Sequence, residues 1–163
     1  MASCVSAPKS ITQECGPQSY KLAYVIDGDT FVATDNEIQF KVRIAGIDTP
    51  EKKQPLSQKA TTKLESLLKN KTITFKKVGK GMDIYSRALG HVYANGENIG
   101  LIMIEEGLAY YYRPTCKDYP QNKEKYNYDP LPYINAENKA KESKLGVWSG
   151  EELMQPCAWR RKK

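Results

Sequence analysis

A segment of strictly alternating side chains constrains this chain more than any other feature of its sequence. In residues 38–44, Ile, Phe, Val and Ile at even positions alternate with Gln, Lys and Arg at odd positions. A period of two places the apolar side chains on one face of a β-strand and the polar ones on the other. Arg43 therefore belongs to the face opposite the core, where its side chain is available to a ligand.

Four further segments have strand character and three have helical character. The turn and apolar patterns predict strands at residues 20–26, 30–34, 72–78 and 89–93, with residues 79–81 opening a loop. A helix with Ser57 as its N-cap is expected from the helical spacing of Ala60, Leu64, Leu67 and Leu68. Two more are expected at 99–106, between an Asn98 cap and a Gly107 stop, and at about 133–144, before Gly146. We therefore predict an α+β fold, a five-stranded Greek-key barrel of the oligonucleotide-binding (OB) type with three α-helices.

The length of 163 residues predicts one domain with a sizeable core. Residues 1–18 are expected to form a loosely ordered N-terminal arm, residues 19–150 the domain, and residues 151–163 a basic C-terminal tail. The segment 113–132 contains four prolines, so it cannot be regular structure throughout. Loops of that length are either functional or disordered.

Charge limits the classes of partner. Lysine and arginine number 25 against 19 acidic residues, which gives a net charge of +6. A basic domain is drawn to nucleic acid or to an anionic membrane, although a modest positive charge also serves solubility alone. No stretch approaches the roughly 18 apolar residues that span a bilayer, so a soluble chain without a membrane-spanning segment is expected.

The four cysteines, Cys4, Cys15, Cys116 and Cys157, are widely spaced, and no C-x-x-C pair occurs among them. This spacing argues against a structural zinc site. Two disulfides in an exported protein fit better, and a bond between Cys116 and Cys157 could staple the tail to the 113–132 loop. Three pairings remain open, as does the alternative of four reduced thiols in the cytosol.

The start of the chain bears on its compartment. Polar residues, rather than an apolar core, follow Met1, so no signal peptide is recognised. We expect a secreted or periplasmic protein in its mature form, with an added start methionine. Ala2-Ser3-Cys4 resembles the end of a lipoprotein cleavage box, so lipid anchoring at Cys4 is a minor alternative.

Several residues could carry phosphodiester chemistry. Asp29 and Asp48 follow predicted strands, and carboxylate oxygens suit Ca²⁺ or Mg²⁺. Arg43 and Arg87 could each bind a phosphate through two parallel hydrogen bonds. Glu51 could accept a proton from an attacking water. Each residue alone is better explained as a turn, a surface ion pair or a solvated carboxylate, but their joint occurrence favours the chemical interpretation.

The single histidine narrows the mechanism. His91 lies between apolar neighbours in a predicted strand and is expected to be structural. Because histidine is otherwise absent, neither a histidine-metal nuclease nor a Ser-His hydrolase is easily built.

Five motifs resemble the staphylococcal nuclease (thermonuclease) family, and in particular its single-domain bacterial members. They occur in the family's order: Val-Ile-Asp-Gly-Asp-Thr at 25–30, Val-Arg-Ile-Ala-Gly-Ile-Asp-Thr-Pro-Glu at 42–51, Asp83-x-Tyr85-x-Arg87, Gly107-Leu108-Ala109 and Gly146-Val147-Trp148. The similarity covers about residues 20–150. It implies a calcium-dependent, sugar-nonspecific nuclease that cleaves DNA and RNA on an OB-fold barrel with three helices, leaving a 3′-phosphate and a 5′-hydroxyl.

The resemblance also implies roles for individual residues. One Ca²⁺ ion, with Mg²⁺ or Mn²⁺ as weaker alternatives, would be bound by the carboxylates of Asp29 and Asp48 and by the backbone carbonyl of Thr49. Arg43 and Arg87 would hold the scissile phosphate, and Glu51 would position or deprotonate the attacking water. Tyr85 would contact a phosphate, and Tyr111 or Tyr112 is the nearest match to tyrosines that line the nucleotide site. Tyr119, Tyr126 and Tyr128 are expected to pack the 113–132 loop.

Three departures from the family pattern, of which one is the 113–132 loop, leave the catalytic groups in place. Ser86 stands where the family usually has glycine, and Lys59 replaces an acidic residue. We therefore expect an active, monomeric endonuclease that prefers single-stranded or frayed DNA and RNA. The alternatives are a non-catalytic OB-fold module that binds nucleic acid, and a protein-interaction domain.

Overall fold

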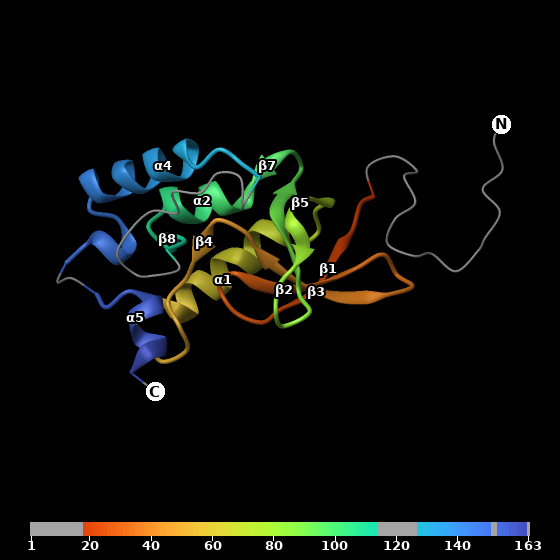
Figure 1. Ribbon diagram of the computed structural model, residues 1–163, viewed down its shortest axis with the longest axis horizontal. Helices are drawn as coiled ribbons and strands as arrows, with labels where there is room; N and C mark the ends of the chain where they lie inside the picture. Colours follow the sequence, from red (N-terminus) through yellow and green to blue (C-terminus); the bar gives the residue numbers. More distant parts are fainter. Residues whose placement is uncertain (1–17, 114–126, 151–152, 163) are drawn as a thin grey trace.

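The computed structural model describes residues 18–113, 127–150 and 153–162. Its main sheet is built from β1 (Lys21–Val25), β2 (Thr30–Thr34), β3 (Gln39–Ile44), β5 (Ile73–Met82), β6 (Ala88–Ala94) and β7 (Glu97–Asn98). The strand order is β1-β2-β3-β6-β5, with β7 paired to β6 (Figure 1). All pairs are antiparallel except β3 with β6.

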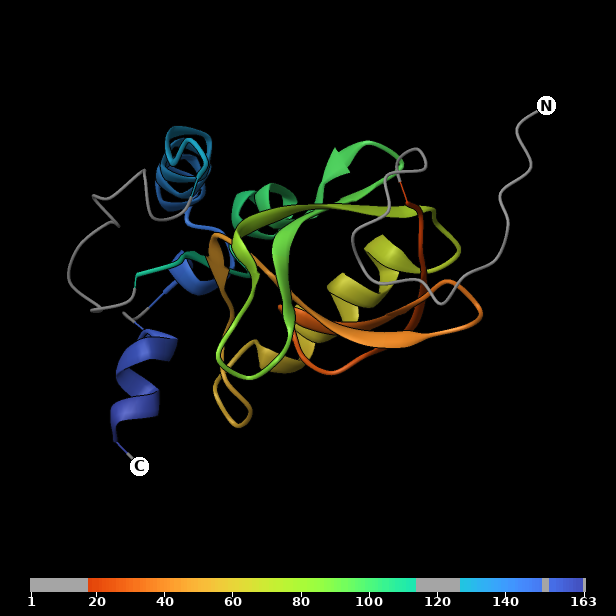
Figure 2. The same cartoon turned by 45° about the vertical axis from the view of Figure 1, so that its right-hand side comes forward.

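The two edges of this sheet meet, as a barrel requires. Tyr20, next to β1, exchanges two backbone hydrogen bonds of 2.7 and 2.8 Å with Ile73 at the start of β5. The five long strands therefore wrap around a common interior (Figure 2). Together with the helices, they confirm the predicted α+β fold of the OB type.

The helices are α1 (Ser57–Leu68), α2 (Ile99–Glu105), α4 (Leu131–Glu142), the 3₁₀ helix η1 (Gly146–Trp148) and α5 (Pro156–Arg161). The three expected α-helices are present, and Asn98 caps α2 by accepting a hydrogen bond of 3.2 Å from the backbone N–H of Leu101. Of the helices in the described ranges, none is both long and apolar enough to cross a membrane.

Three local predictions were wrong. Ser57 is the first residue of α1 rather than its cap, because Leu56 occupies the N-cap position with a φ of 68° and no capping side chain. Residues 79–81 belong to β5 instead of a loop, because a register shift between Lys77 and Met82 lets the strand keep pairing with β6. Helix α4 begins at Leu131 rather than at about 133, because Pro132 lies in its first turn, where the N–H that proline lacks would have no partner within the helix.

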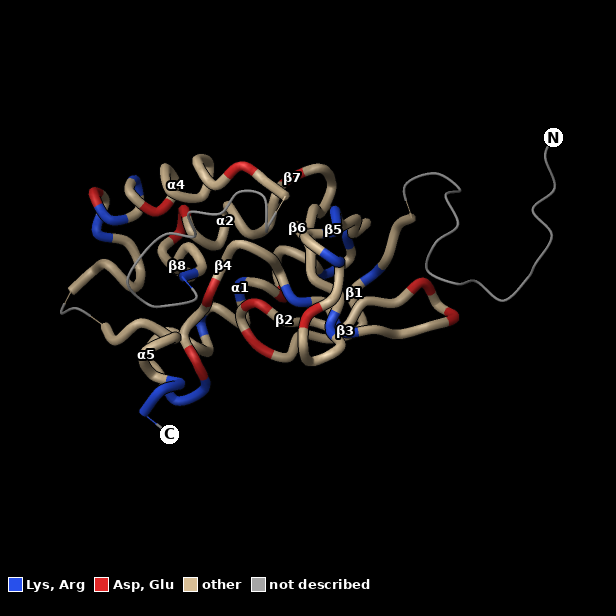
Figure 3. The backbone as a smooth tube through the Cα atoms, in the orientation of Figure 1, with Lys and Arg blue, Asp and Glu red and all other residues tan. Residues whose placement is uncertain are grey.

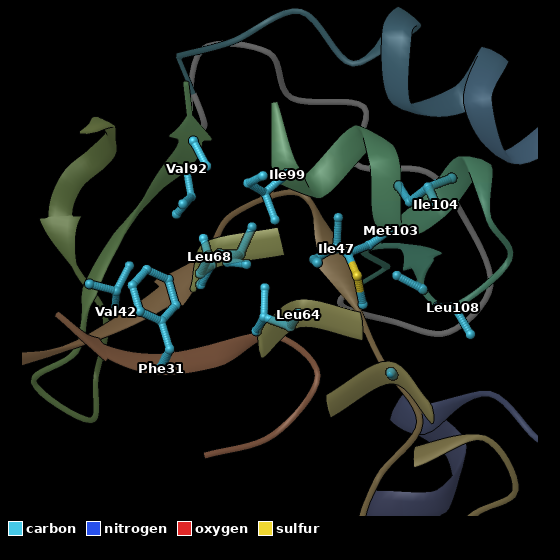
Figure 4. Close-up of a cluster of buried hydrophobic side chains, with 14 of the residues drawn as sticks. Phe31, Val42, Ile47, Leu64, Leu68, Val92, Ile99, Met103, Ile104 and Leu108 are labelled. Carbon is cyan, nitrogen blue, oxygen red and sulfur yellow. The ribbon is translucent and has the colours of Figure 1, made fainter. Parts of the chain in front are cut away.

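The core lies between the barrel, α1 and α2. Phe31 and Val42 of the sheet meet Leu64 and Leu68 of α1, and α2 covers this cluster with Met103 (Figure 4). All of these side chains are buried. A small second sheet of β4 (Ile47–Asp48) and β8 (Tyr110–Tyr111) extends the structure beside the barrel. It carries the segment after β3 away from the barrel strands and toward α5.

Candidate active site

One cleft of about 790 Å³ collects most of the residues singled out by the sequence. Its lining includes Asp27, Asp29, Arg43, Asp48, Glu51, Asp83, Tyr85, Arg87, Tyr112, Tyr128 and Arg160. They come from the ends of β1, β3, β4 and β5 and the loops that follow these strands, from the residue after β8, from the segment before α4, and from α5. The cleft is therefore assembled from segments far apart in the sequence.

Strand register explains how the arginines reach the cleft. In the β2–β3 pair, Arg43 lies opposite Thr30, so it is next to Asp29. In the parallel β3–β6 pair, Arg43 lies beside Leu89, which brings Arg87 to the same end of the sheet. The side chain of Arg43 projects from the face opposite the core, as predicted, and remains 12% exposed.

Both carboxylate oxygens of Asp29 have partners. Its Oδ1 accepts a hydrogen bond of 3.0 Å from the Thr30 hydroxyl and lies 3.2 Å from Nε of Arg43. Its Oδ2 accepts from the backbone N–H and the hydroxyl of Thr49, at 3.1 and 3.0 Å. These bonds join the start of β2 to the end of β4, which fixes Asp29 relative to Asp48.

Asp48 is the more deeply enclosed of the two candidate metal ligands. Its carboxylate lies 3.5 Å from Nη2 of Arg43, and its side chain is 5% exposed. Burial raises the pKa of Asp48, and the negative charge of Asp29 raises it further, whereas the hydrogen bonds and charge of Arg160 and the charge of Arg43 oppose this rise. The two aspartates therefore share the Arg43 guanidinium and repel each other.

Asp27 adds to this negative charge. Burial and the charge of Asp29 raise the pKa of Asp27 to about 6. No cluster of three or more His, Cys, Asp or Glu side chains forms a ready metal cage within ranges 18–113, 127–150 and 153–162. Asp29 and Asp48 line the cleft with carboxylate oxygens, the type of ligand that Ca²⁺ takes. Thr49 is buried beside Asp29 and does not line the cleft.

Arg87 is oriented by Asp83, the first residue of the Asp83-x-Tyr85-x-Arg87 motif. Nε of Arg87 donates a 2.7 Å hydrogen bond to Oδ2 of Asp83, while Oδ1 accepts the backbone N–H groups of Tyr85 and Arg87 at 2.9 and 3.0 Å. Burial alone would raise the pKa of Asp83, but these hydrogen bonds lower it. Ser86 has a φ of 58°, a left-handed conformation that explains why glycine is usual there.

Glu51 is fixed at its backbone and at its side chain. Its N–H donates a 2.8 Å hydrogen bond to Oε1 of Gln54, whose Nε2 donates to the carbonyl of Met154 at 2.7 Å. Its Oε1 accepts a 2.6 Å hydrogen bond from Nη1 of Arg160. Sequence reasoning missed Arg160 because it treated residues 151–163 as a tail, and a run of basic residues gives no local signal of its partners.

The tyrosines divide into two groups. Tyr85 is 72% exposed and lines the cleft together with Tyr112, so both can meet a nucleic acid. Tyr111 cannot, contrary to one of the two expected assignments, because it is 1% exposed and its ring stacks on Tyr133 in the core. Tyr128 packs against His91 and also lines the cleft, while Tyr119 and Tyr126 lie outside the described residues.

His91 is structural, as expected. It is buried in β6, and its Nδ1 lies 2.6 Å from the Tyr133 hydroxyl. Burial, with a smaller contribution from the charge of Lys76, lowers the pKa of His91 to about 4, so the ring is neutral at pH 7. Of the four cysteines, Cys4, Cys15 and Cys116 lie outside the described residues, so the open question of how the cysteines pair stays a prediction.

Comparison with known proteins agrees with this geometry. The family model described as "Staphylococcal nuclease homologue" matches residues 41–150. A protein of Escherichia coli O157:H7 named "Uncharacterized endonuclease" is 34% identical over 151 residues, which cover 91% of this chain and 89% of that protein.

Two further relatives carry more specific names. The "Micrococcal nuclease" of Shigella flexneri is 34% identical over 146 residues, covering 84% of this chain and 77% of its own length. The "Thermonuclease" of Staphylococcus intermedius is 30% identical over 146 residues, covering 86% and 81% of the two chains. The segment that contains α5 follows the part of the chain matched by the family model.

Proposed function

This chain belongs to the staphylococcal nuclease family, and on this premise we propose that it is a calcium-dependent endonuclease that hydrolyses phosphodiester bonds of DNA and RNA. The observation that carries the proposal is a single cleft in which two arginines face a cluster of carboxylates. Arginine suits the phosphate and the carboxylates suit a hard cation.

Arg43 and Arg87 would bind the scissile phosphate and stabilise the charge that develops on its oxygens. Both guanidiniums are pre-oriented, Arg43 by Asp29 and Arg87 by Asp83, with distances of 3.2 and 2.7 Å to the respective carboxylate oxygens. Donors that are already in place need no reorganisation when the reaction occurs.

Glu51 would hold the attacking water in line with the phosphate and accept its proton. Its side chain is 31% exposed at the cleft, so water can reach it. The calcium ion would be held by Asp29, Asp48 and the carbonyl of Thr49, and when bound it would supply Lewis-acid polarisation of the phosphate.

Tyr85 and Tyr112 would contribute contacts that do not depend on base sequence. An exposed ring beside Arg87, whose guanidinium carbon lies 5.3 Å from the Tyr85 ring centre, can contact a phosphate or stack on a base. Such contacts favour single-stranded or frayed segments, because the faces of bases in a duplex are covered by the stacked neighbouring bases. We propose this preference and a monomeric state.

A non-catalytic nucleic-acid-binding module would explain the basic charge and the tyrosines but not the site. Such a module has no use for carboxylates that repel its ligand, yet Asp27, Asp29 and Asp48 converge in the cleft.

We also propose that the protein is secreted or periplasmic and that its cysteines form disulfide bonds. Intact mass before and after reduction and alkylation will test whether the cysteines are oxidised.

The decisive experiment incubates plasmid DNA and RNA with the protein in calcium, in magnesium, in manganese and in a chelator. We expect cleavage of both substrates in calcium, weaker cleavage with the other metals and none in the chelator. Arg87→Ala should lower kcat by about 10²–10³, as for loss of one transition-state donor, whereas Lys80→Ala, an exposed residue outside the cleft, should retain the wild-type rate. Wild-type protein that fails to cleave in calcium would refute the proposal.

A further inference from the structure

Helix α5 places an arginine on two carboxylates of the candidate active site. Nη1 and Nη2 of Arg160 donate to Oδ1 and Oδ2 of Asp48 at 3.0 and 2.8 Å. Nη1 also donates to Oε1 of Glu51 at 2.6 Å. In the backbone drawing, the basic end of α5 lies beside the acidic positions at and after β4 (Figure 3). One guanidinium thus bridges the candidate metal ligand and the candidate base.

This contact differs from an ordinary surface ion pair. The Asp48 side chain is 5% exposed, so its partner meets a carboxylate that has lost most of its water. The planar fork of arginine matches both oxygens of a carboxylate, which the single ammonium group of lysine cannot do. Because each carboxylate oxygen has two lone pairs, Asp48 can accept this fork and still offer a lone pair to a cation.

The same C-terminal segment also holds the backbone of Glu51. The carbonyl of Met154 accepts from Gln54, and Gln54 in turn accepts from the Glu51 N–H, at 2.7 and 2.8 Å. Pro156 is buried, which anchors the start of α5. The main chain and the side chain of Glu51 are therefore tied, at two separate points, to residues 154–160.

We propose that Arg160 is a positioning residue of the active site, which holds Glu51 beside Asp48 and toward the cleft. This rests on the proposed nuclease function. Without the guanidinium, the carboxylates of Glu51 and Asp48 repel each other, and Glu51 is free to turn into solvent. Since the family model matches residues 41–150, the site is completed by a segment that follows the matched part.

The test compares Arg160→Gln with Arg161→Gln, which makes the same charge change on an exposed neighbour in the same helix. In metal-free protein, hydrogen exchange of residues 49–56 should be faster in Arg160→Gln and unchanged in Arg161→Gln. With DNA and calcium, Arg160→Gln should lower kcat roughly 100-fold with KM nearly unchanged, the scale of effect expected from a misplaced catalytic group.

Two further variants separate positioning from a folding defect. Arg160→Lys keeps the charge without the fork and should give an intermediate kcat. Arg160→Ala should regain activity with added guanidinium chloride, more than with sodium chloride at equal ionic strength, because the ion can occupy the vacated position.

The proposal is overturned if Arg160→Gln matches Arg161→Gln in both exchange and kcat, or if KM rises while kcat is kept. If the wild-type protein does not cleave DNA in calcium, the proposed nuclease function is refuted. The exchange comparison in metal-free protein still decides whether Arg160 orders the Glu51 segment.

Discussion

At the scale of single residues, the site depends on a residue that has no side chain. Gly28 is buried between Asp27 and Asp29, where the chain passes close to α1 and to the end of β4. A Cβ at this position would lie 2.8 Å from Cβ of Ala60 and 2.8 Å from Oγ1 of Thr49. Thr49 is the residue whose N–H and hydroxyl both bind Asp29, so crowding here would disturb a candidate metal ligand directly.

We therefore predict that Gly28→Ala destabilises the protein and weakens its calcium binding. Overpacking of this kind costs about 1–3 kcal/mol in free energy of unfolding. Urea denaturation measures the loss, and calorimetric titration with calcium measures the affinity. Gly150→Ala is the control, since a Cβ there meets nothing within 4 Å. Equal stability of the two variants would show that Ala60 and Thr49 can move aside.

Residue identities in the site were largely predictable, whereas their partners were not. Arg43 follows from the alternation of its strand, because a period of two determines which face a side chain occupies. Arg160 is separated from Asp48 and Glu51 by more than 100 residues, so no local pattern connects them. The choice between Tyr111 and Tyr112 also needed the structure, because Tyr111 pairs with β4 and is buried, whereas Tyr112 follows strand β8 and lines the cleft.

At the scale of elements, hydrophobic periodicity predicted the long strands and helices but not the short ones. Buried apolar residues recur at the expected period in the longer elements, for example Val42 and Ile44 in β3 and Ala60, Leu64 and Leu68 in α1. The β4–β8 pair is only two residues long in each strand, which is too short for any period to appear. Helix α5 contains a proline, a cysteine and two arginines in six residues, so its composition resembles a tail. The β4–β8 pair and helix α5 therefore depend on tertiary contacts.

One tertiary contact joins β8 to α4 through a buried charge. Glu137 of α4 is fully buried and accepts hydrogen bonds from the Tyr111 N–H at 2.9 Å and from Nη1 of Arg113 at 3.0 Å. Its other carboxylate oxygen accepts from Nη2 of Arg113 and, at 2.9 Å, from Nζ of Lys141. Burial alone would raise the pKa of Glu137, but the bonds from Arg113 and Lys141 outweigh it and lower the pKa from 4.5 to about 2.

This contact predicts a pH-dependent effect of Glu137→Gln. Because the folded-state pKa is lower than the unfolded one, the charged form stabilises the protein fully above pH 4.5 and progressively less as the pH falls toward 2. At neutral pH, the substitution leaves Arg113 without its carboxylate and should cost about 3–5 kcal/mol. The difference in free energy of unfolding between wild type and variant should become smaller as the pH falls from 4.5 to 2.

Urea denaturation of both proteins at a series of pH values measures this difference. Glu142→Gln, an exposed change in the same helix, should have little effect at any pH. If the difference in free energy of unfolding stayed constant down to pH 2, the pKa of Glu137 would not be lowered in the folded protein, contrary to what its hydrogen bonds indicate.

At the scale of the whole molecule, two opposite charge distributions coexist. The chain has a net charge of +6, which attracts a polyanion over a long range. The cleft nevertheless concentrates Asp27, Asp29 and Asp48, and this cluster exists only in the folded state because β-strand pairing brings together the turn after β1 and the end of β4. A cation that binds there must therefore bind the folded protein far better than the unfolded chain.

This difference predicts that calcium raises the thermal stability of the protein. A ligand that binds only the folded state, at 100 times its Kd, adds about 2.7 kcal/mol to the free energy of unfolding. For a chain of this size, that gain corresponds to a rise in Tm of roughly 5–10 °C. Calorimetric scans with calcium, with magnesium and with a chelator measure it, and magnesium should give a smaller rise. Asp48→Asn should abolish the calcium effect, whereas Glu65→Gln, on α1 and outside the cleft, should retain it. If calcium raised the Tm of Asp48→Asn as much as that of wild type, the ion would be bound elsewhere, and the paired aspartates would have to be explained as structural partners of Arg43 and Arg160 alone.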